Sequence, residues 1–163
     1  MGKIMKALAI TALIATIAGA LAVLYALNTM TPVIEQATLL VTPAQQAQEV
    51  FDQTMDSLRE GTFAGHAYAD AQGLSSQDCA FVTVTARLRN RGFFPAEWLS
   101  MEIAPVQGDV LQLDNYGANV LNVGSQGDLS ATMLCMGDGQ AARSFTVTGY
   151  VFGQKITFGG TAQ

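Results

Sequence analysis

Few residues of this chain combine a type and a spacing that could support catalysis. The single histidine, His66, lies in the strand-like stretch 63–68, and nucleophilic catalysis would need it beside a nucleophile. Four aspartates lie in turn-like segments: Asp109, Asp114, Asp128 and Asp138. They could meet around Ca²⁺ or flank a glycosidic bond, although aspartate near glycine is ordinary turn chemistry. Because the motifs GxSxG, HExxH and the P-loop do not occur, we expect no enzyme activity.

The two cysteines, Cys79 and Cys135, could form a disulfide or remain two independent buried thiols. A bridge would close a loop of about 57 residues and stabilise the fold by roughly 4 kcal/mol on the chain-entropy model. The alternation of residues along the predicted strands supports the disulfide only in part. Cys135 falls on the same side as the apolar Met133, whereas Cys79 falls on the side opposite Val82. With no CxxC motif and one histidine, we expect no metal site and no cofactor.

A row of arginines is the most prominent cationic feature. Arg87, Arg89 and Arg91 stand at i, i+2 and i+4, so on a strand they would project from one face about 7 Å apart. Guanidinium groups in a row could bind the carboxylates or phosphates of a partner protein, an anionic surface polymer or a lipid headgroup. The alternative is a solvated strand face paired with Glu97 or Glu102.

The densest aromatic stretch, FFPAEW (93–98), directly follows these arginines. Its side chains either seal one end of the domain or form an exposed apolar patch, which would mark a partner surface. We expect Trp98 in the core rather than at the surface. The candidate contact site consists of Arg87, Arg89, Arg91, Phe93 and Phe94.

The elements that position these residues begin with an uncharged run of 21 residues, 7–27. As a helix it would be about 31 Å long, close to the roughly 30 Å of a bilayer's hydrocarbon core. The run therefore predicts a transmembrane helix with the lipid bilayer as its partner. Ala15 and Gly19 lie on one side of it, where a second helix could pack closely.

The basic residues predict how this helix is oriented. Lys3 and Lys6 precede the run, no acidic residue does, and the next basic residue is Arg59. The positive-inside rule places residues 1–6 in the cytoplasm and the C-terminal domain outside it, on a single-pass protein of the cell membrane. A cleaved signal peptide ending at 20–22 is the alternative, although the apolar run continues beyond that point. Beyond residue 27 there are 13 acidic and six basic residues, and this net negative charge argues against nucleic acid as a partner.

Residues 28–61 predict a connector and one amphipathic helix over about 43–60. Thr42 would be the N-cap, Pro43 the first helical residue and Gln45 part of a capping box. Gly61 fits the C-cap. Apolar residues recur at helical spacing: Ala47, Val50, Phe51, Met55 and Leu58. The run 37–41 is a first strand or a packed connector.

From residue 62 the pattern changes to period two, which predicts an antiparallel β-sandwich over 62–163. The clearest strand is 79–88, where apolar and polar residues alternate before an Asn-Arg-Gly turn. The other predicted strands, separated by glycine-bearing turns, are 63–68, 98–104, 110–113, 120–123, 129–136, 144–152 and 155–158.

Three stretches resemble a known class of modules: VTVTARLRNRGFFPAEW (82–98), LNVGSQGDLSATMLC (121–135) and SFTVTGYVFGQKITF (144–158). Their order is similar to that of immunoglobulin-like, fibronectin-type-III-like modules of single-pass bacterial surface proteins. The resemblance covers about residues 62–160. It implies an immunoglobulin-like sandwich and carries no catalytic residue.

These features together predict a membrane-anchored extracytoplasmic module for binding or assembly, without catalysis. One alternative is an accessory single-pass subunit of a larger membrane complex. Another is a surface hydrolase that uses the turn carboxylates.

Overall fold

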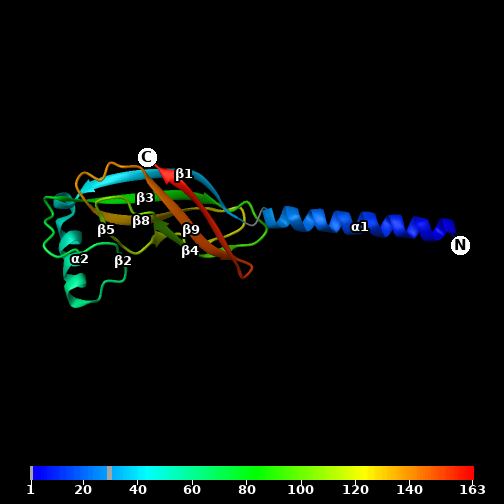
Figure 1. Cartoon of the computed structure of the whole chain (residues 1–163), viewed down its shortest axis with the longest axis horizontal. Helices are drawn as coiled ribbons and strands as arrows, with labels where there is room; N and C mark the ends of the chain where they lie inside the picture. The colour runs from blue at the N-terminus through cyan, green and yellow to red at the C-terminus, as the bar shows by residue number, and fades with distance from the viewer. Residues whose placement is uncertain (1, 29–30) are drawn as a thin grey trace.

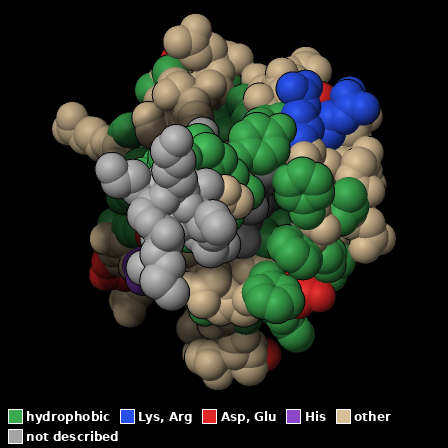
Figure 2. Space-filling view, turned by 90° about the vertical axis from the view of Figure 1, so that its right-hand side faces the viewer, with side chains coloured by type: hydrophobic (Ala, Val, Ile, Leu, Met, Phe, Trp, Pro, Cys, Tyr) green, Lys and Arg blue, Asp and Glu red, His purple; other side chains and the backbone are tan. Residues whose placement is uncertain are grey.

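The computed structural model describes residues 2–28 and 31–163, with side chains in the first helix described from residue 10 to 25. That helix, α1 (Gly2–Asn28), extends away from one end of the remaining domain (Figure 1). Seen from this end, hydrophobic side chains form much of the surface (Figure 2). Among the described residues, no helix combines the length and the apolar content that a membrane crossing requires. The side chains of Lys3 and Lys6, which set the predicted orientation, lie outside the described residues.

The rest of the chain is a sandwich of two antiparallel sheets. The first sheet has the order β1 (Val33–Pro43), β3 (Cys79–Arg89), β8 (Gln126–Met136), β5 (Asp109–Gln112) and β2 (His66–Ala67), and β6 (Tyr116–Gly117) also pairs with β8. The second sheet has the order β10 (Gln154–Ala162), β9 (Arg143–Val151), β4 (Ala96–Ile103) and β7 (Val120–Leu121).

The order of the seven longer strands identifies the class of sandwich. Lettered A to G along the chain, they are β1, β3, β4, β5, β8, β9 and β10. The sheets then read A-B-E-D and G-F-C, which is the arrangement of constant-type immunoglobulin domains. The predicted immunoglobulin-like β-sandwich is confirmed at this level.

Period-two alternation explains the core. In β3, Val82, Val84, Ala86 and Leu88 are fully buried between the sheets, and each valine or leucine side chain contributes about 1.5–3 kcal/mol by leaving water. The alternate residues face outward, where β3 pairs with β8 through hydroxyl contacts such as Thr83 to Thr132 at 2.9 Å. The predicted strand 79–88 is therefore confirmed.

The sandwich begins at Val33, not at residue 62. Strand β1 pairs with β3 from Val33 opposite Arg89 to Pro43 opposite Ala80, so part of the predicted connector is an edge strand. This pairing keeps Thr42 and Pro43 extended, and the predicted capping box is wrong. A 3-10 helix, η1 (Ala44–Ala47), follows the strand, and neither it nor the next helix has a side-chain cap at its start.

The predicted amphipathic helix is present as α2 (Gln48–Glu60). It ends at Gly61, whose φ of +69° and N–H to the Leu58 oxygen form the expected glycine C-cap. Phe51 and Met55 are buried with Phe81 and Leu134 of the first sheet. Helix α2 thus covers the outer face of that sheet at the end opposite α1 (Figure 1).

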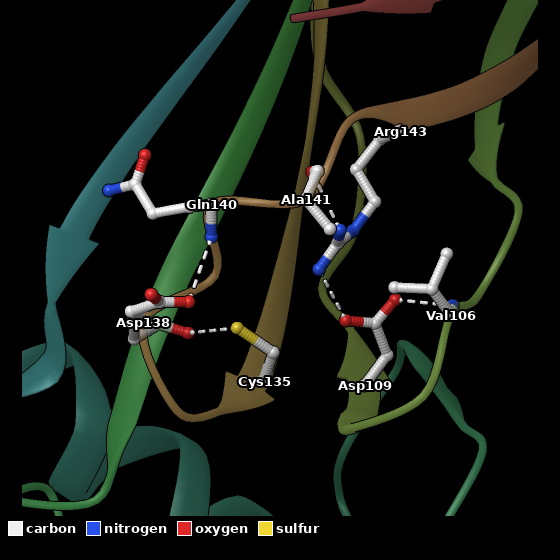
Figure 3. A network of polar contacts seen from close by, with 8 residues as sticks. Val106, Asp109, Cys135, Asp138, Gln140, Ala141 and Arg143 are labelled. Atoms are coloured by element: carbon white, nitrogen blue, oxygen red, sulfur yellow. Dashed lines mark hydrogen bonds and ion pairs between the residues drawn. The ribbon is translucent and has the colours of Figure 1, made fainter.

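A buried ion pair joins the two sheets. Figure 3 shows Arg143 of β9 between Asp109 of β5 and the carbonyl of Ala141. Arg143 donates to the Asp109 carboxylate at 2.8 Å and to the Ala141 oxygen at 2.7 Å, and Asp109 also accepts from the N–H of Val106 at 2.8 Å. Both charged side chains are almost completely buried. Charges so far from water require each other, because either one alone would be strongly penalised.

Strand β5 also makes a second polar contact with the other sheet. Gln112 of β5 is buried, accepts from the N–H of Ile103 at 2.8 Å and donates to the oxygen of Met101 at 2.9 Å. These bonds satisfy backbone groups on the edge of β4. Strand β5 therefore fixes the second sheet on the first at two points.

We expect Asp109→Ala to lower the free energy of unfolding by about 3–5 kcal/mol, because it leaves Arg143 buried and unpaired. Urea unfolding of the full chain in detergent measures this. Asp138→Ala is the matched control, since Asp138 is an exposed aspartate in a nearby turn. Equal losses in the two variants would contradict the structural role of the pair.

Candidate functional site

Exposed apolar side chains cluster at the end of the sandwich from which α1 leaves. We call this surface the α1-end face and define it by Phe93, Trp98, Val120, Val123 and Phe152, which are between 47% and 76% exposed. They come from the 90–95 loop, the start of β4, the β7 region and the β9–β10 hairpin. The strand register brings these segments to the end where β1 begins, because Val33 lies opposite Arg89 and Arg89 opposite Gln126.

Asn90 holds this end together. Its side chain is buried, donates to the oxygens of Phe94 at 2.7 Å and Leu121 at 2.9 Å, and accepts from the N–H of Gly92 at 2.9 Å. Its backbone N–H also donates to the oxygen of Ser125 at 3.0 Å. The sequence indicated only a turn here. The Asn-x-Gly spacing was the available signal for a side chain that bonds to the backbone two residues on.

The two candidate phenylalanines have different environments. Phe93 is 63% exposed. Phe94 is half-buried and packs on Phe152 with ring centroids 5.0 Å apart, which joins the 90–95 loop to the β9–β10 hairpin. Phe94 therefore supports the α1-end face, and Phe93 forms part of its surface.

Trp98 and Phe152 are the two non-glycine residues with positive φ among those described, at +53° and +50°. Phe152 begins a two-residue hairpin of the kind that favours asparagine or glycine. Trp98 lies in an irregularity of β4 between Glu97 and Ser100, and it is 74% exposed. The expectation that Trp98 is a core residue is wrong. Positive φ costs such residues about 1–3 kcal/mol, so both exposed aromatic rings are held at a conformational cost.

The arginine row has acidic partners, but not the predicted Glu97 or Glu102. Arg87 forms two hydrogen bonds with Asp128 of β8, at 2.9 and 3.2 Å. Arg89 and Arg91 both contact Glu35, at 3.3 and 3.4 Å. Glu35 is the extra residue of a β-bulge in β1, which turns its side chain toward these arginines. Three guanidinium groups thus face two carboxylates.

The same contacts shift the pKa values of the acidic groups. Desolvation acts to raise the pKa of Glu35, but the hydrogen bond and charge of Arg89, with Gln126 and Arg91, bring it below its ordinary value. The hydrogen bond from Arg87 is the main cause of the lowered pKa of Asp128. Both groups are accessible to solvent, so their effect on stability is modest.

The cysteines are two free, buried thiols. Ala80 lies opposite Cys135, so Cys79 and Cys135 face opposite sides of the first sheet: Cys79 lies under α2 and Cys135 between the sheets. This contradicts the disulfide hypothesis. Burial raises the pKa of both thiols, which makes them poor nucleophiles.

The structure does not bring the other candidate groups together for catalysis. Asp109 is paired with Arg143 and Asp128 with Arg87, while Asp114 and Asp138 are exposed. Among the described residues, no group of three His, Cys, Asp or Glu side chains could hold a metal ion. His66 is exposed, with its ring 4.7 Å from that of Tyr68.

A concave region lies at the opposite end of the sandwich from the α1-end face. Its volume is about 1230 Å³, and it is formed by α2 and residues 67–76. Its walls carry Asp52, Asp56 and Asp70, and Asp56 is paired with Arg59 at 2.9 Å. None of the residues selected from the sequence as a contact site lines it.

Comparisons with known proteins were made for the whole chain. No protein-family model and no curated protein sequence matches it. The GAE domain of yeast GGA1 has a TM-score of 0.37 and 12% identity, covering 60% of this chain and 96% of that one. The GAE domain of GGA2p from Saccharomyces cerevisiae has a TM-score of 0.36 and 8% identity, covering 80% and 92%. Neither likeness assigns a family, and the description of the fold rests on the strand order.

We expect Asn90→Ala to destabilise the α1 end by about 2–4 kcal/mol, because it leaves buried backbone groups of Phe94, Leu121 and Gly92 without partners. Urea unfolding measures the loss, and hydrogen exchange of the Gly92 amide should become faster. Asn122→Ala, at an exposed position of the same end, is the control. Unchanged exchange at Gly92 would refute this role of Asn90.

Glu35→Gln tests the acidic side of the arginine row. A lowered folded pKa means that the carboxylate contributes stability above its ordinary value of 4.5 and loses it as the pH falls through the lowered value. The variant should therefore be less stable than the natural chain at neutral pH, with a difference that shrinks in acid. Thermal unfolding between pH 7 and pH 3 measures this, with Glu60→Gln at the exposed end of α2 as the control. A difference independent of pH would contradict the assignment.

Proposed function

We propose that this chain is a membrane-anchored extracytoplasmic module for binding or assembly, with no catalytic role. Helix α1 lies in the lipid bilayer, residues 1–6 are cytoplasmic, and the sandwich is held outside at the surface of the cell membrane. The resemblance to modules of single-pass bacterial surface proteins supports this proposal.

The observation that carries the proposal is the surface of α1. Seven of its large aliphatic side chains are each more than half exposed: Ile10, Leu13, Ile14, Ile17, Leu21, Val23 and Leu24. Leaving one such side chain in water forgoes about 1.5–3 kcal/mol relative to burial. No charged residue interrupts 7–27. A lipid environment removes this cost, and the helix satisfies its own backbone hydrogen bonds there.

The connection between helix and sandwich is short. Helix α1 ends at Asn28 and β1 begins at Val33, so four residues join them. Four residues span at most about 14 Å. With α1 in the bilayer, the α1-end face stays close to the membrane, and we propose this face as the contact surface for a partner at the membrane.

The pairing of two of the four turn carboxylates with arginines argues against the hydrolase alternative. An acid or nucleophile must be available to the substrate. Asp109 is instead buried against Arg143, and Asp128 is held by Arg87.

The accessory-subunit alternative has its own observation. Ala15 and Gly19 lie on the side of α1 opposite Ile17 and Leu21, and a methyl group added at Gly19 would meet nothing within 4 Å. A partner helix could approach closely there. Loss of co-purifying membrane proteins in Gly19→Leu, but not in Ala18→Leu, would favour this alternative.

We expect the full chain to remain in the membrane fraction after a carbonate wash. Ile14→Lys with Ile17→Lys should abolish this retention, since each lysine costs about 2.5–3.5 kcal/mol at the centre of a transmembrane helix. Leu40→Lys is the matched control, because Leu40 is an exposed leucine of β1.

Protease added to intact cells should remove a C-terminal tag and leave the α1 fragment protected. Full release of the natural chain by carbonate would overturn the anchor. A tag that is cut only after lysis would overturn the orientation.

A further inference from the structure

We propose that the α1-end face lies directly on the bilayer surface, so that lipid headgroups and upper acyl chains are the partner of its aromatic side chains. This inference rests on the proposed membrane anchor and names the partner of the same surface. It assigns to Phe93, Trp98 and Phe152 the role of a second membrane contact beside α1.

Geometry brings the surface to the lipid. The four-residue connection is too short to move the sandwich far from the end of α1. The connections that carry the exposed side chains lie at this same end (Figure 1). Seen along α1, hydrophobic side chains gather beside the helix, with cationic side chains at their border (Figure 2).

The chemistry of the surface also fits the membrane interface. Tryptophan is enriched at this depth, and phenylalanine inserts readily beside it. The side chain of Arg91 is 64% exposed at the border. The three arginines of the row face only two carboxylates, so the row keeps one unbalanced positive charge. Anionic lipid headgroups attract this cationic border. The rest of the domain carries a net negative charge and is repelled by them.

Among the residues that the structure describes, positive φ at non-glycine positions is found only on this surface. The positive φ values of Trp98 and Phe152 are found at two of its most exposed side chains. The Trp98 ring is 74% exposed, and the Phe152 ring is 76% exposed although it contacts Phe94. A polar or glycine residue would relieve the hairpin at position 152. The surface that each ring leaves exposed is therefore available for a contact outside the domain.

The bilayer is a better occupant than another protein, because it is always within reach. The anchor makes contact with lipid an intramolecular event, which raises the effective concentration without any new binding partner. A protein would have to enter the narrow space between the sandwich and the membrane.

The chain has one tryptophan, so Trp98 reports on this surface alone. The experiment places the full chain in nanodiscs, one chain per disc, with either ordinary lipids or lipids brominated on the upper acyl chain. We expect a blue-shifted emission that the brominated lipid quenches. Phe93→Ser with Phe152→Ser should reduce the quenching. Leu40→Ser, an equally exposed apolar position away from this end, should leave it unchanged.

Each outcome decides the inference. Emission typical of water-exposed tryptophan, without quenching, overturns it even if α1 is inserted, and the anchor then stands alone. Release of the chain from the disc overturns the anchor and the inference together. A blue shift that appears only with two chains per disc would identify a second copy as the occupant and also overturn it.

Discussion

The pair between Arg143 and Asp109 fixes how the two sheets lie on each other. The apolar core between them is stabilised without strong directional preference, since hydrophobic burial depends on area rather than orientation. A buried guanidinium must meet its carboxylate at hydrogen-bond distance, and this requirement sets the position of β9 relative to β5. Strand β9 leads from Arg143 to Val151, directly before the hairpin that carries Phe152. The surface at one end of the molecule is therefore positioned by an ion pair at the other.

The sequence was sufficient for the sandwich and the second helix, and the reason is periodicity. Alternation from residue 79 to 88 marks the core side of β3, and the helical spacing of Phe51 and Met55 marks the buried side of α2. The sequence pattern predicted only part of strand β1. Its first residues include Glu35 in a bulge, which interrupts the alternation.

What could not be predicted depends on contacts distant in sequence. Arg143 resembles an exposed residue at the start of a strand until Asp109 is placed opposite it. Trp98 has a large apolar side chain of the kind that is usually found in a core. The irregularity in β4 places both Glu97 and Trp98 outside, and Leu99 takes the buried position instead. The arginine row was visible as a pattern, but its partners come from two other strands.

The length of the sandwich separates its two ends. Strands β3 and β8 have 11 residues each, which corresponds to about 36 Å from the α1 side to the α2 side. In an anchored chain, the concave region beside α2 would stand well beyond the lipid headgroups. Anything that enters it would have to come from the aqueous phase, and would meet the acidic side chains of Asp52, Asp56 and Asp70 at the end of the sandwich farthest from α1.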